Sequence, residues 1–461
     1  MNTFTLNRLI PFAVLALAAI VAMFIPSLPN FSDTSKYNGA DIAWVAVGAS
    51  LVFLMTPGLS FFYGGMVNRK NVISTMIKSF VATGIISLLW VVVGFGLSFG
   101  PSIGGFIGNP SSHFFFKDVN SSAPWSLAPT IPLLLFALFQ MKFAIITPAL
   151  VVGAVAERIR FTSYLVFIVL FGLLIYAPIA HWTWHPDGLL FKMGVLDFAG
   201  GTVVHISAGC AALAGAIVLK KRKSKEVQPA NIAYVVLGTG LLWFGWFGFN
   251  AGSALGANDL AVSAFATTNT ASAVAGLSWM LFDYARGKKP TVLGFCIGAV
   301  VGLVAITPAA GYVAIPQSAF IGFIAAIISN VAVYWKEKSG IDDTLDVFPC
   351  HGLGGMVGMV LTGVFATKNV NPAGGIGLWY GESALFISQL KGLAIVVAYS
   401  FTVSLVIFKV LDLLNPIRVS QKEEERGLDE TQHGEKYVQG TLLVDHNGSL
   451  LEKDPVEPLA I

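Results

Sequence analysis

The sequence predicts an all-α polytopic membrane protein with eleven core transmembrane helices, built as two inverted five-helix repeats plus a final helix. Three observations predict this class: the composition, a series of long apolar runs, and motifs that recur five runs apart. Of the 461 residues, 55% are hydrophobic and 11% are charged, whereas about 25% are charged in soluble domains. The 48 glycines are expected where membrane helices pack closely through small residues.

Apolar runs of about 20 residues, the length that crosses the hydrocarbon core of a bilayer, divide the chain into eleven expected spans. Their ranges are 41–66, 72–99, 129–154, 161–181, 195–219, 230–251, 258–284, 290–310, 315–335, 347–366 and 383–413. Together they predict a membrane domain over residues 40–414, followed by a polar tail over residues 415–461.

Basic residues gather in alternate loops, and this asymmetry predicts the orientation of the chain. If the first span runs inward, the inner loops hold 14 basic residues and the outer loops three. The inner set is Arg69, Lys70, Arg158, Arg160, Lys220, Lys221, Arg222, Lys223, Lys225, Arg286, Lys288, Lys289, Lys336 and Lys338; the outer set is Lys117, Lys192 and Lys368. The tail is therefore expected to be cytoplasmic.

Residues 1–30 admit two interpretations. Arg8 and the apolar run Leu9–Ile25 resemble the first two regions of a signal peptide, but Ile25–Asn30 is a poor match to a cleavage site. The segment is either a signal peptide or an extra N-terminal transmembrane segment. Both interpretations place residue 40 outside.

Charge and cysteine usage argue against several function classes. The net charge of +3 is too small to indicate nucleic-acid binding. Cys210, Cys296 and Cys350 lie in apolar segments without metal-ligand spacing, which favours simple packing roles. We expect no enzyme, no cofactor, no metal site and no nucleic-acid partner.

Related motifs recur five spans apart. The expected third span contains Thr147-Pro148 within Ile-Ile-Thr-Pro-Ala, and the eighth contains Thr307-Pro308 within Ala-Ile-Thr-Pro-Ala. A repeat unit with an odd number of spans must invert in the membrane. Inverted repeats place a substrate site near the midplane, at the interface between the two halves.

Two histidines lie inside corresponding spans, within the segments Asp197 to His205 and Asp346 to His351. A titratable group in the bilayer interior is costly, so it usually faces a pathway. Imidazole can also donate and accept a proton near neutral pH. We expect one histidine from each half to meet in a transport pathway, while a haem with two axial histidines is the alternative.

The residues around this pair carry two possible roles each. Asp197 opens its span, where it could cap the helix or attract a cation. Phe139 and Phe143 lie four residues apart and so share a helix face, and Trp184 lies in an outer loop. The aromatic side chains could form an interfacial belt or a cation–π cage for a small cation.

With these motifs, roughly residues 40–430 resemble the ammonium transporter family (Amt/Mep/Rh), of the bacterial Amt type. The shared motifs are Phe61–Gly65, Phe139-Gln140 with Phe143, Ala156–Phe161, Asp197–His205, Gly245–Ser253, Ile306–Pro308 and His351-Gly352. The Asp…His motif and the Gly245–Ser253 motif are highly specific together. One departure is Lys142, where many members have an uncharged residue; it is expected to point away from the gate face.

The resemblance implies an ammonium transporter of the plasma or inner membrane, a homotrimer with one pore in each subunit. An outer site would recruit ammonium, an aromatic gate would lie below it, and a histidine pair would share a hydrogen bond in a narrow apolar pore. The implied substrate-binding residues are Trp184, Phe139, Ser253 and Asp197, the gate residues are Phe143 and Phe249, and the pore residues are His205 and His351.

The pore should favour neutral ammonia, because a bare ammonium ion pays a large desolvation cost and burial of an amine favours its neutral form. Potassium has no proton to lose and should be rejected by the same barrier. Whether the proton crosses with ammonia is left open. An ammonium sensor and a haem-binding electron carrier are the alternative functions; sensors of this family usually carry an appended signalling domain, which a tail of about 45 residues could not hold.

The tail motifs Gly427–Glu430 and His433–Glu435 resemble the family's cytoplasmic tail. The resemblance implies a folded element beneath the pore that couples neighbouring subunits. It also implies a docking surface for a P-II-type nitrogen regulatory protein. Gly427 is a plausible hinge, whereas the alternative interpretation of residues 415–461 is a solvated tail.

Overall fold

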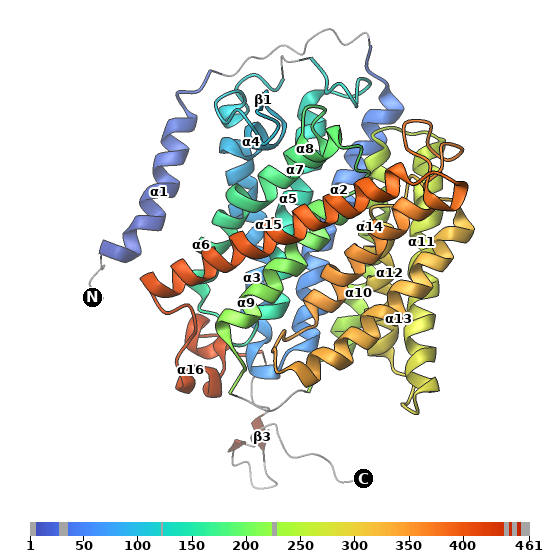
Figure 1. Ribbon diagram of the computed structural model, residues 1–461. Helices are drawn as coiled ribbons and strands as arrows, with labels where there is room; N and C mark the ends of the chain where they lie inside the picture. The colour runs from blue at the N-terminus through green and yellow to red at the C-terminus, as the bar shows by residue number, and fades with distance from the viewer. Residues whose placement is uncertain are drawn as a thin grey trace.

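The computed structural model describes residues 6–26, 36–120, 123–223, 228–437, 442–444 and 450–452. Within this part of the chain, ten helical stretches are apolar and long enough to cross a membrane, and two shorter apolar helices accompany them, Leu9–Ala22 and Val292–Ile306. The helices form one bundle (Figure 1). The expected class, a polytopic helical membrane protein, is confirmed.

The described chain follows the expected order of two sets of five membrane segments and a final helix. The first set is α2 (Gly39–Met66); α3 (Val72–Leu89) with η3 (Trp90–Gly94) and α4 (Phe95–Phe99); α5 (Leu133–Val155); α6 (Phe161–Phe171) with η5 (Gly172–Tyr176) and α7 (Ala177–Trp184); and η6 (Gly201–Ile206) with α9 (Ser207–Leu219). The second set is α10 (Ile232–Ala251) with η7 (Gly252–Ala254); α11 (Asp259–Ala285); α12 (Val292–Ile306); α13 (Ile315–Ser339); and η8 (Phe348–Leu353) with α14 (Gly354–Phe365).

The final helix, α15 (Ala384–Leu414), runs obliquely across the outside of the bundle (Figure 1). The short elements are α1 (Leu6–Ala22), η2 (Arg69–Asn71), η4 (Phe114–Phe116), α8 (Leu189–Lys192), η9 (Leu378–Tyr380), α16 (Gln421–Arg426) and η10 (Asp429–His433), with the strand pairs β1 (Ser102–Ile103)/β2 (Ile107–Gly108) and β3 (Leu442–Val444)/β4 (Leu450–Glu452). The expected eighth span is shorter than predicted, because α12 ends at Ile306 and a series of turns follows it.

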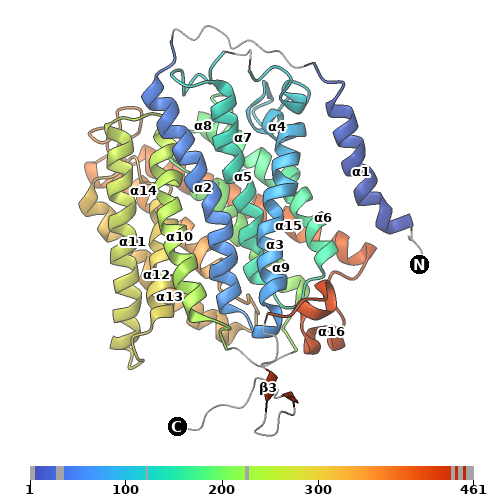
Figure 2. The ribbon, with the colours of Figure 1, turned by 180° about the vertical axis from the view of Figure 1, so that it is seen from behind.

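The two halves are joined along α2 and α10, the first helix of each set, which pack side by side (Figure 2). Glycines allow this close approach. A Cβ atom on Gly238 would lie 2.3 Å from the backbone nitrogen of Phe62, and one on Gly248 would lie 2.6 Å from the carbonyl oxygen of Gly48. Small residues at helix crossings are the usual means of close packing in membranes.

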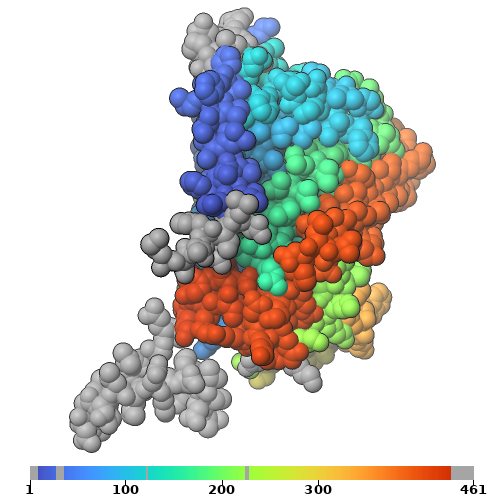
Figure 3. Space-filling model, turned by 90° about the vertical axis from the view of Figure 1, so that its left-hand side faces the viewer, coloured from blue at the N-terminus to red at the C-terminus, as the bar shows by residue number. Residues whose placement is uncertain are grey.

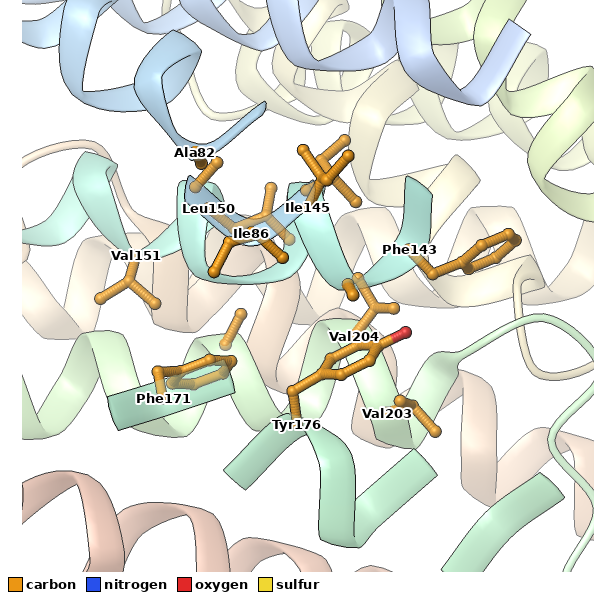
Figure 4. Close-up of a cluster of buried hydrophobic side chains, with 14 of the residues drawn as sticks. Ala82, Ile86, Phe143, Ile145, Leu150, Val151, Phe171, Tyr176, Val203 and Val204 are labelled. Atoms are coloured by element: carbon orange, nitrogen blue, oxygen red, sulfur yellow. The ribbon is translucent and has the colours of Figure 1, made fainter. Parts of the chain in front are cut away.

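Inside the first half, apolar side chains from several segments fill the space between helices. Figure 4 shows Ile86 of α3, Leu150 of α5, Phe171 of α6 and Val204 of η6 gathered in one cluster. The helix α5 is buried nearly all round, so it is hydrophobic on every face and has no polar stripe. This packing fixes α5, which carries the aromatic residues of the site, against the segment that carries His205.

The helix α1 lies apart from the bundle (Figures 1 and 2). Its apolar side chains are exposed, with Phe12 at 71%. Helical structure suits both a signal peptide and an extra membrane segment, so the prediction for residues 1–30 stays open. Residues 27–30 of the possible cleavage region, Lys225 of the inner loops and residues 438–441, 445–449 and 453–461 of the tail lie outside the described residues.

Residues 415–437 of the tail fold against one end of the bundle, which we call the tail side (Figure 3). The helix α16 begins with a capping box between Ser420 and Glu423. The carboxylate of Asp429 accepts hydrogen bonds from the backbone N–H groups of Ile73, at 3.1 Å, and Ser74, at 2.7 Å. It thereby satisfies N–H groups at the start of α3 that have no partner within the helix. This docked part of the tail is a folded element.

We predict that Asp429→Ala loosens the docked tail, because α3 loses a cap worth about 0.5–2 kcal/mol, which corresponds to roughly 2- to 30-fold more of the undocked state. Trypsin should then cut faster at Lys422 and Arg426, as measured on purified protein. Glu425→Ala is the matched control. The backbone carbonyl oxygen of Glu425 accepts a hydrogen bond from Lys70, just before α3, and the alanine variant keeps this bond. Equal cleavage rates in the two variants would contradict the docking role of Asp429.

Candidate functional site

The structure brings His205 and His351 together from the two halves of the bundle. Their Nδ1 atoms lie 3.4 Å apart, so one ring donates a hydrogen bond to the other. The ring centroids are 5.5 Å apart with an angle of 27° between the planes. Both side chains are buried, at 1% and 3% exposure. The meeting of one histidine from each half is therefore a feature of the fold.

Each histidine lies on a six-residue π-helical segment, His205 on η6 and His351 on η8. A π-helical turn is wider than an α-helical turn, is rare, and is found mostly at functional sites. The segment η6 begins after Gly200, whose φ of 114° suits glycine and few other residues. The local backbone thus places both imidazoles at irregular points of otherwise ordinary helices.

The carboxylate of Asp197 caps the segment that carries His205. It accepts hydrogen bonds from the backbone N–H groups of Gly200 at 2.8 Å, Gly201 at 2.7 Å and Thr202 at 2.7 Å, and also from the hydroxyl of Thr202. The side chain is 5% exposed. The capping role expected from the sequence is therefore present, and the carboxyl group lies at the positive end of the helix dipole.

The counterpart of Asp197 in the second half is Asp343, and the sequence-based pairing with Asp346 was wrong. Asp343 and Asp197 each lie eight residues before their histidine. Asp343 accepts hydrogen bonds from the N–H groups of Val347 at 3.0 Å and Phe348 at 2.7 Å. Burial, with Asp346 nearby, raises the pKa of Asp343 to about 6. Asp346 has a left-handed backbone conformation, with φ of 57°, and its carboxylate instead forms an ion pair with Lys336 at 2.6 Å.

A small cavity of about 10 Å³ adjoins the histidine pair. We call it the lumen. It is lined by the two histidines and by Met55, Leu59, Phe62, Ile146, Leu150, Val204, Leu242, Trp246, Phe249 and Val300. This volume leaves room for about one water molecule, and the walls other than the imidazoles and the indole are apolar. The lumen cannot accommodate a haem, so the geometry does not support the electron-carrier alternative.

A larger cavity of about 440 Å³, the vestibule, opens on the side of the bundle away from the tail. Three of the expected binding residues line it: Trp184, Asp197 and Ser253. The indole N–H of Trp184 donates to the carbonyl oxygen of Asp197 at 3.1 Å, which fixes the plane of the ring. The hydroxyl of Ser253 donates to the carbonyl oxygen of Phe249 at 2.7 Å, so its oxygen can accept a hydrogen bond from a ligand.

The rings of Phe143 and Phe249 separate the vestibule from the lumen. Their centroids are 4.3 Å apart. Phe143 lines the vestibule, and Phe249 lines the lumen, with its ring 5.9 Å from the ring of His205. Figure 4 shows Phe143 on the α5 segment, as a member of the buried apolar cluster. A molecule that moves from the vestibule to the histidines must displace or pass these two rings.

The structure places Phe139 apart from the other expected binding residues. Its ring is fully buried, packs edge-to-face on Phe143 with centroids 5.0 Å apart, and lies against Gly252. Among the described residues that line the vestibule, Gln140 is present and Phe139 is not. The ring of Phe139 instead packs against Gly252 and Phe143, and its part in the recruitment site stays a prediction.

Sequence reasoning missed two groups of residues at the site. Gln140, Thr183, Tyr312 and Asn371 add polar groups to the vestibule; the one visible signal was a glutamine in the middle of an apolar span. Trp246 was noted only as part of a motif. Its indole ring stacks on His205, with centroids 5.3 Å apart and planes 17° from parallel.

Lys142 lies away from the vestibule, as expected. Its Nζ atom sits 5.1 Å from the ring centroid of Phe53, a side chain 41% exposed on α2. The lysine therefore lies toward the outside of the bundle, where a cation–π contact partly offsets its cost in an apolar setting.

The described residues contain no cluster of three or more His, Cys, Asp or Glu side chains that could hold a metal ion. The three cysteines are free and buried.

Comparisons with known proteins agree on one family. The model of the Ammonium Transporter Family matches residues 43–438. An ammonium transporter of Bacillus subtilis is 46% identical over 411 residues, which cover 87% of this chain and 99% of that protein. An ammonium transporter of Aquifex aeolicus is 45% identical over 411 residues, covering 88% and 95%.

Solved structures give the same result for the fold. The crystal structure of Candida albicans Mep2 has a TM-score of 0.80 at 38% identity and covers 84% of this chain and 88% of its own. A structure described as a sensor Amt protein has a TM-score of 0.79 at 33% identity, with coverage of 86% and 98%.

We predict that Asp197→Ala lowers the thermal stability of the purified protein, because several buried N–H groups lose their acceptor. Each unpaired buried donor costs about 1–3 kcal/mol, and Asp197→Asn should fall between the wild type and the alanine variant. The matched control is Asp187→Ala, which removes an exposed ion pair with Lys192 that solvent and salt screen strongly. The capping account would be refuted by equal unfolding temperatures for Asp197→Ala and Asp187→Ala.

Proposed function

The chain belongs to the Ammonium Transporter Family, and we propose on that premise that its vestibule, aromatic gate and histidine pair form one conduction pathway. The protein is a multi-pass membrane protein that transports ammonium. The observation that carries the proposed mechanism is the position of the histidine pair. It adjoins a narrow, mainly apolar lumen of about 10 Å³, which lies behind two stacked phenylalanine rings.

Capture of ammonium occurs in the vestibule. The faces of Trp184 and Phe143 attract a cation through their ring quadrupoles, by about 0.5–2 kcal/mol for each contact. Ser253 accepts a hydrogen bond from the ion. Asp197 does not bind the ion directly, because its carboxylate is occupied by the helix cap. Its backbone carbonyl oxygen holds the indole of Trp184 in place, and its carboxylate contributes negative charge to the region. Phe139 supports Phe143 from behind.

Ammonium gives up its proton before the lumen, because an unsolvated cation among apolar walls would pay the desolvation cost of an unpaired charge. Ammonia passes Phe143 and Phe249 and meets the imidazoles, whose ring nitrogens can exchange hydrogen bonds with it. The proton either returns to the outer solution or crosses along the histidine pair. Potassium cannot lose its charge in this way, so the same barrier excludes it.

The assembly and the orientation of the chain are further parts of the proposal. The protein forms a homotrimer in the plasma or inner membrane, with one pathway in each subunit. Large apolar side chains on the outside of the bundle, including Phe53, Phe80 and Phe244, suit contact with lipid as well as with a neighbouring subunit, so the trimer rests on the family resemblance. The tail side is cytoplasmic, as the distribution of basic residues predicts, and its docked tail is the surface for a P-II-type regulatory protein.

An ammonium sensor of the same fold is the second candidate, since a structure described as a sensor Amt protein is similar to this chain at a TM-score of 0.79. Ammonium flux through the purified protein in liposomes distinguishes the two functions, because a sensor needs only to bind.

We predict that His205→Ala and His351→Ala, alone and together, change ammonium conduction severalfold or admit potassium, because the pathway loses its proton-competent pair. The measurement is the current in proteoliposomes after an ammonium or a potassium pulse, with folding checked by gel filtration. His113→Gln, in an outer loop, is the control. If the double variant matches the wild type for both ions, the histidines are only packing residues.

We predict that Trp184→Leu raises the ammonium concentration that gives half-maximal current, by roughly 2- to 30-fold, as expected for the loss of about 0.5–2 kcal/mol. Trp182→Leu is the matched control, because the indole of Trp182 donates to the carbonyl oxygen of Phe106 at 2.7 Å and packs on Tyr399. If both variants kept the wild-type ammonium concentration for half-maximal current, Trp184 would be a residue of the interfacial aromatic belt and not of the binding site.

We predict that truncation after Pro416 reduces or deregulates transport without preventing trimer assembly, because the docked tail is lost from the pore exit. Truncation after Tyr437 is the control, since it keeps every docked residue. Transport is measured in liposomes, and binding of a P-II protein is measured on the same samples. If the protein truncated after Pro416 transports normally and binds the P-II protein as tightly as the full chain, the tail is only a solvated end.

A further inference from the structure

The Thr-Pro motif of the second half holds the tryptophan that stacks on His205. The hydroxyl oxygen of Thr307 accepts a hydrogen bond from the indole N–H of Trp246 at 2.9 Å, while the hydroxyl donates to the carbonyl oxygen of Leu303 at 2.8 Å. Thr307 and Trp246 are buried. A buried indole N–H nearly always has a partner, and this one determines how the indole ring is turned.

The ring of His205 depends on its neighbours for its orientation. Its Nδ1 atom is engaged with His351, but its Nε2 atom is buried and has no hydrogen-bond partner within the described part of the chain. Functional histidines are usually oriented by a hydrogen bond at the second ring nitrogen. In His205 the ring is instead held by the stacked indole of Trp246, with the two ring centroids 5.3 Å apart.

The neighbouring Pro308 contacts the start of the same histidine segment. Its carbonyl oxygen accepts a hydrogen bond from the N–H of Phe198 at 3.2 Å. A Cβ atom on Gly201 would lie 2.6 Å from the ring of Pro308, so this glycine lets the two elements touch. The corner after α12 therefore contacts both the first turn of η6 and the indole that stacks on its imidazole.

We propose that Thr307 is a positioning residue for His205, acting through Trp246. The inference rests on the proposed role of His205 in conduction. Loss of the hydroxyl frees the indole to turn, and the imidazole stacked on it then turns as well. The separation of the two Nδ1 atoms changes, and the shared hydrogen bond of the histidine pair weakens.

The repeat supplies a matched control. Thr147 is the corresponding residue of the first half, and its hydroxyl donates to the carbonyl oxygen of Phe143 on its own helix at 2.6 Å. Both threonines are buried, precede a proline and donate to the residue four positions earlier. Thr307 differs in also accepting from Trp246. Threonine-to-valine changes at the two positions therefore remove the same helix bond and differ by one side-chain contact.

The experiment compares Thr307→Val, Thr307→Ser and Thr147→Val in proteoliposomes. Ammonium current is recorded with the ¹⁵N spectrum of protein labelled at histidine, in which His205→Ala identifies the signal of His205. We expect Thr307→Val to lower the current roughly fivefold, the factor that corresponds to one lost hydrogen bond, and to shift the His205 signal. Thr307→Ser should restore both properties, and Thr147→Val should leave the His205 signal in place.

The inference is overturned if Thr307→Val and Thr147→Val give the same current and the same His205 signal. If His205→Ala itself conducts normally, the proposed conduction pathway is wrong. This outcome is distinct from failure of the inference about Thr307. If Thr307→Val does not fold, Trp246→Phe replaces it, because that change removes the donor rather than leaving it unpaired. An unshifted His205 signal in Trp246→Phe would equally overturn the inference.

Discussion

A cation cannot enter a narrow apolar passage without losing most of its hydration, and this constraint governs the arrangement of the whole site. The lumen of about 10 Å³ leaves no room for a hydration shell. Cation capture is therefore confined to the vestibule, where indole and phenyl faces and polar groups can replace part of the lost water. The rings of Phe143 and Phe249 mark the boundary. Beyond them the protein offers imidazole nitrogens, which suit a neutral hydrogen-bonding molecule.

The fold maintains this arrangement by satisfying the backbone at each irregular point. Both histidines lie on π-helical segments, and each segment begins at a buried aspartate that accepts its free N–H groups. In a membrane those groups have no water to bond, so an unsatisfied one is costly. The inverted repeat places the two caps at opposite ends of the bundle and the two imidazoles between them. The halves are not equivalent, however, because Trp246 stacks only on His205 among the described histidines.

The sequence predicted the membrane segments and the meeting of the two histidines well, because apolar length and repeated motifs are local signals. It was less informative where tertiary packing decides. Phe139 and Phe143 share a helix face, but the ring of Phe139 packs closely against Gly252, while Gln140 lines the vestibule. Asp346 was paired with His351 by proximity, whereas backbone geometry gives the cap to Asp343. The contact between Thr307 and Trp246 spans 61 residues, and no pattern in a single sequence reveals it.

The central claim is that the pathway admits ammonia and excludes any cation that cannot lose its charge. The most direct measurement applies equal pulses of ammonium, potassium and trimethylammonium chloride to proteoliposomes containing the wild-type protein, while current and internal pH are recorded together. Relative to protein-free liposomes, the account predicts a faster change in internal pH or a current with ammonium, and neither with potassium. Trimethylammonium can lose a proton but is too large for the lumen, so the protein should add nothing to the response that trimethylamine gives by crossing the lipid itself. A potassium current comparable with the ammonium response would contradict the account.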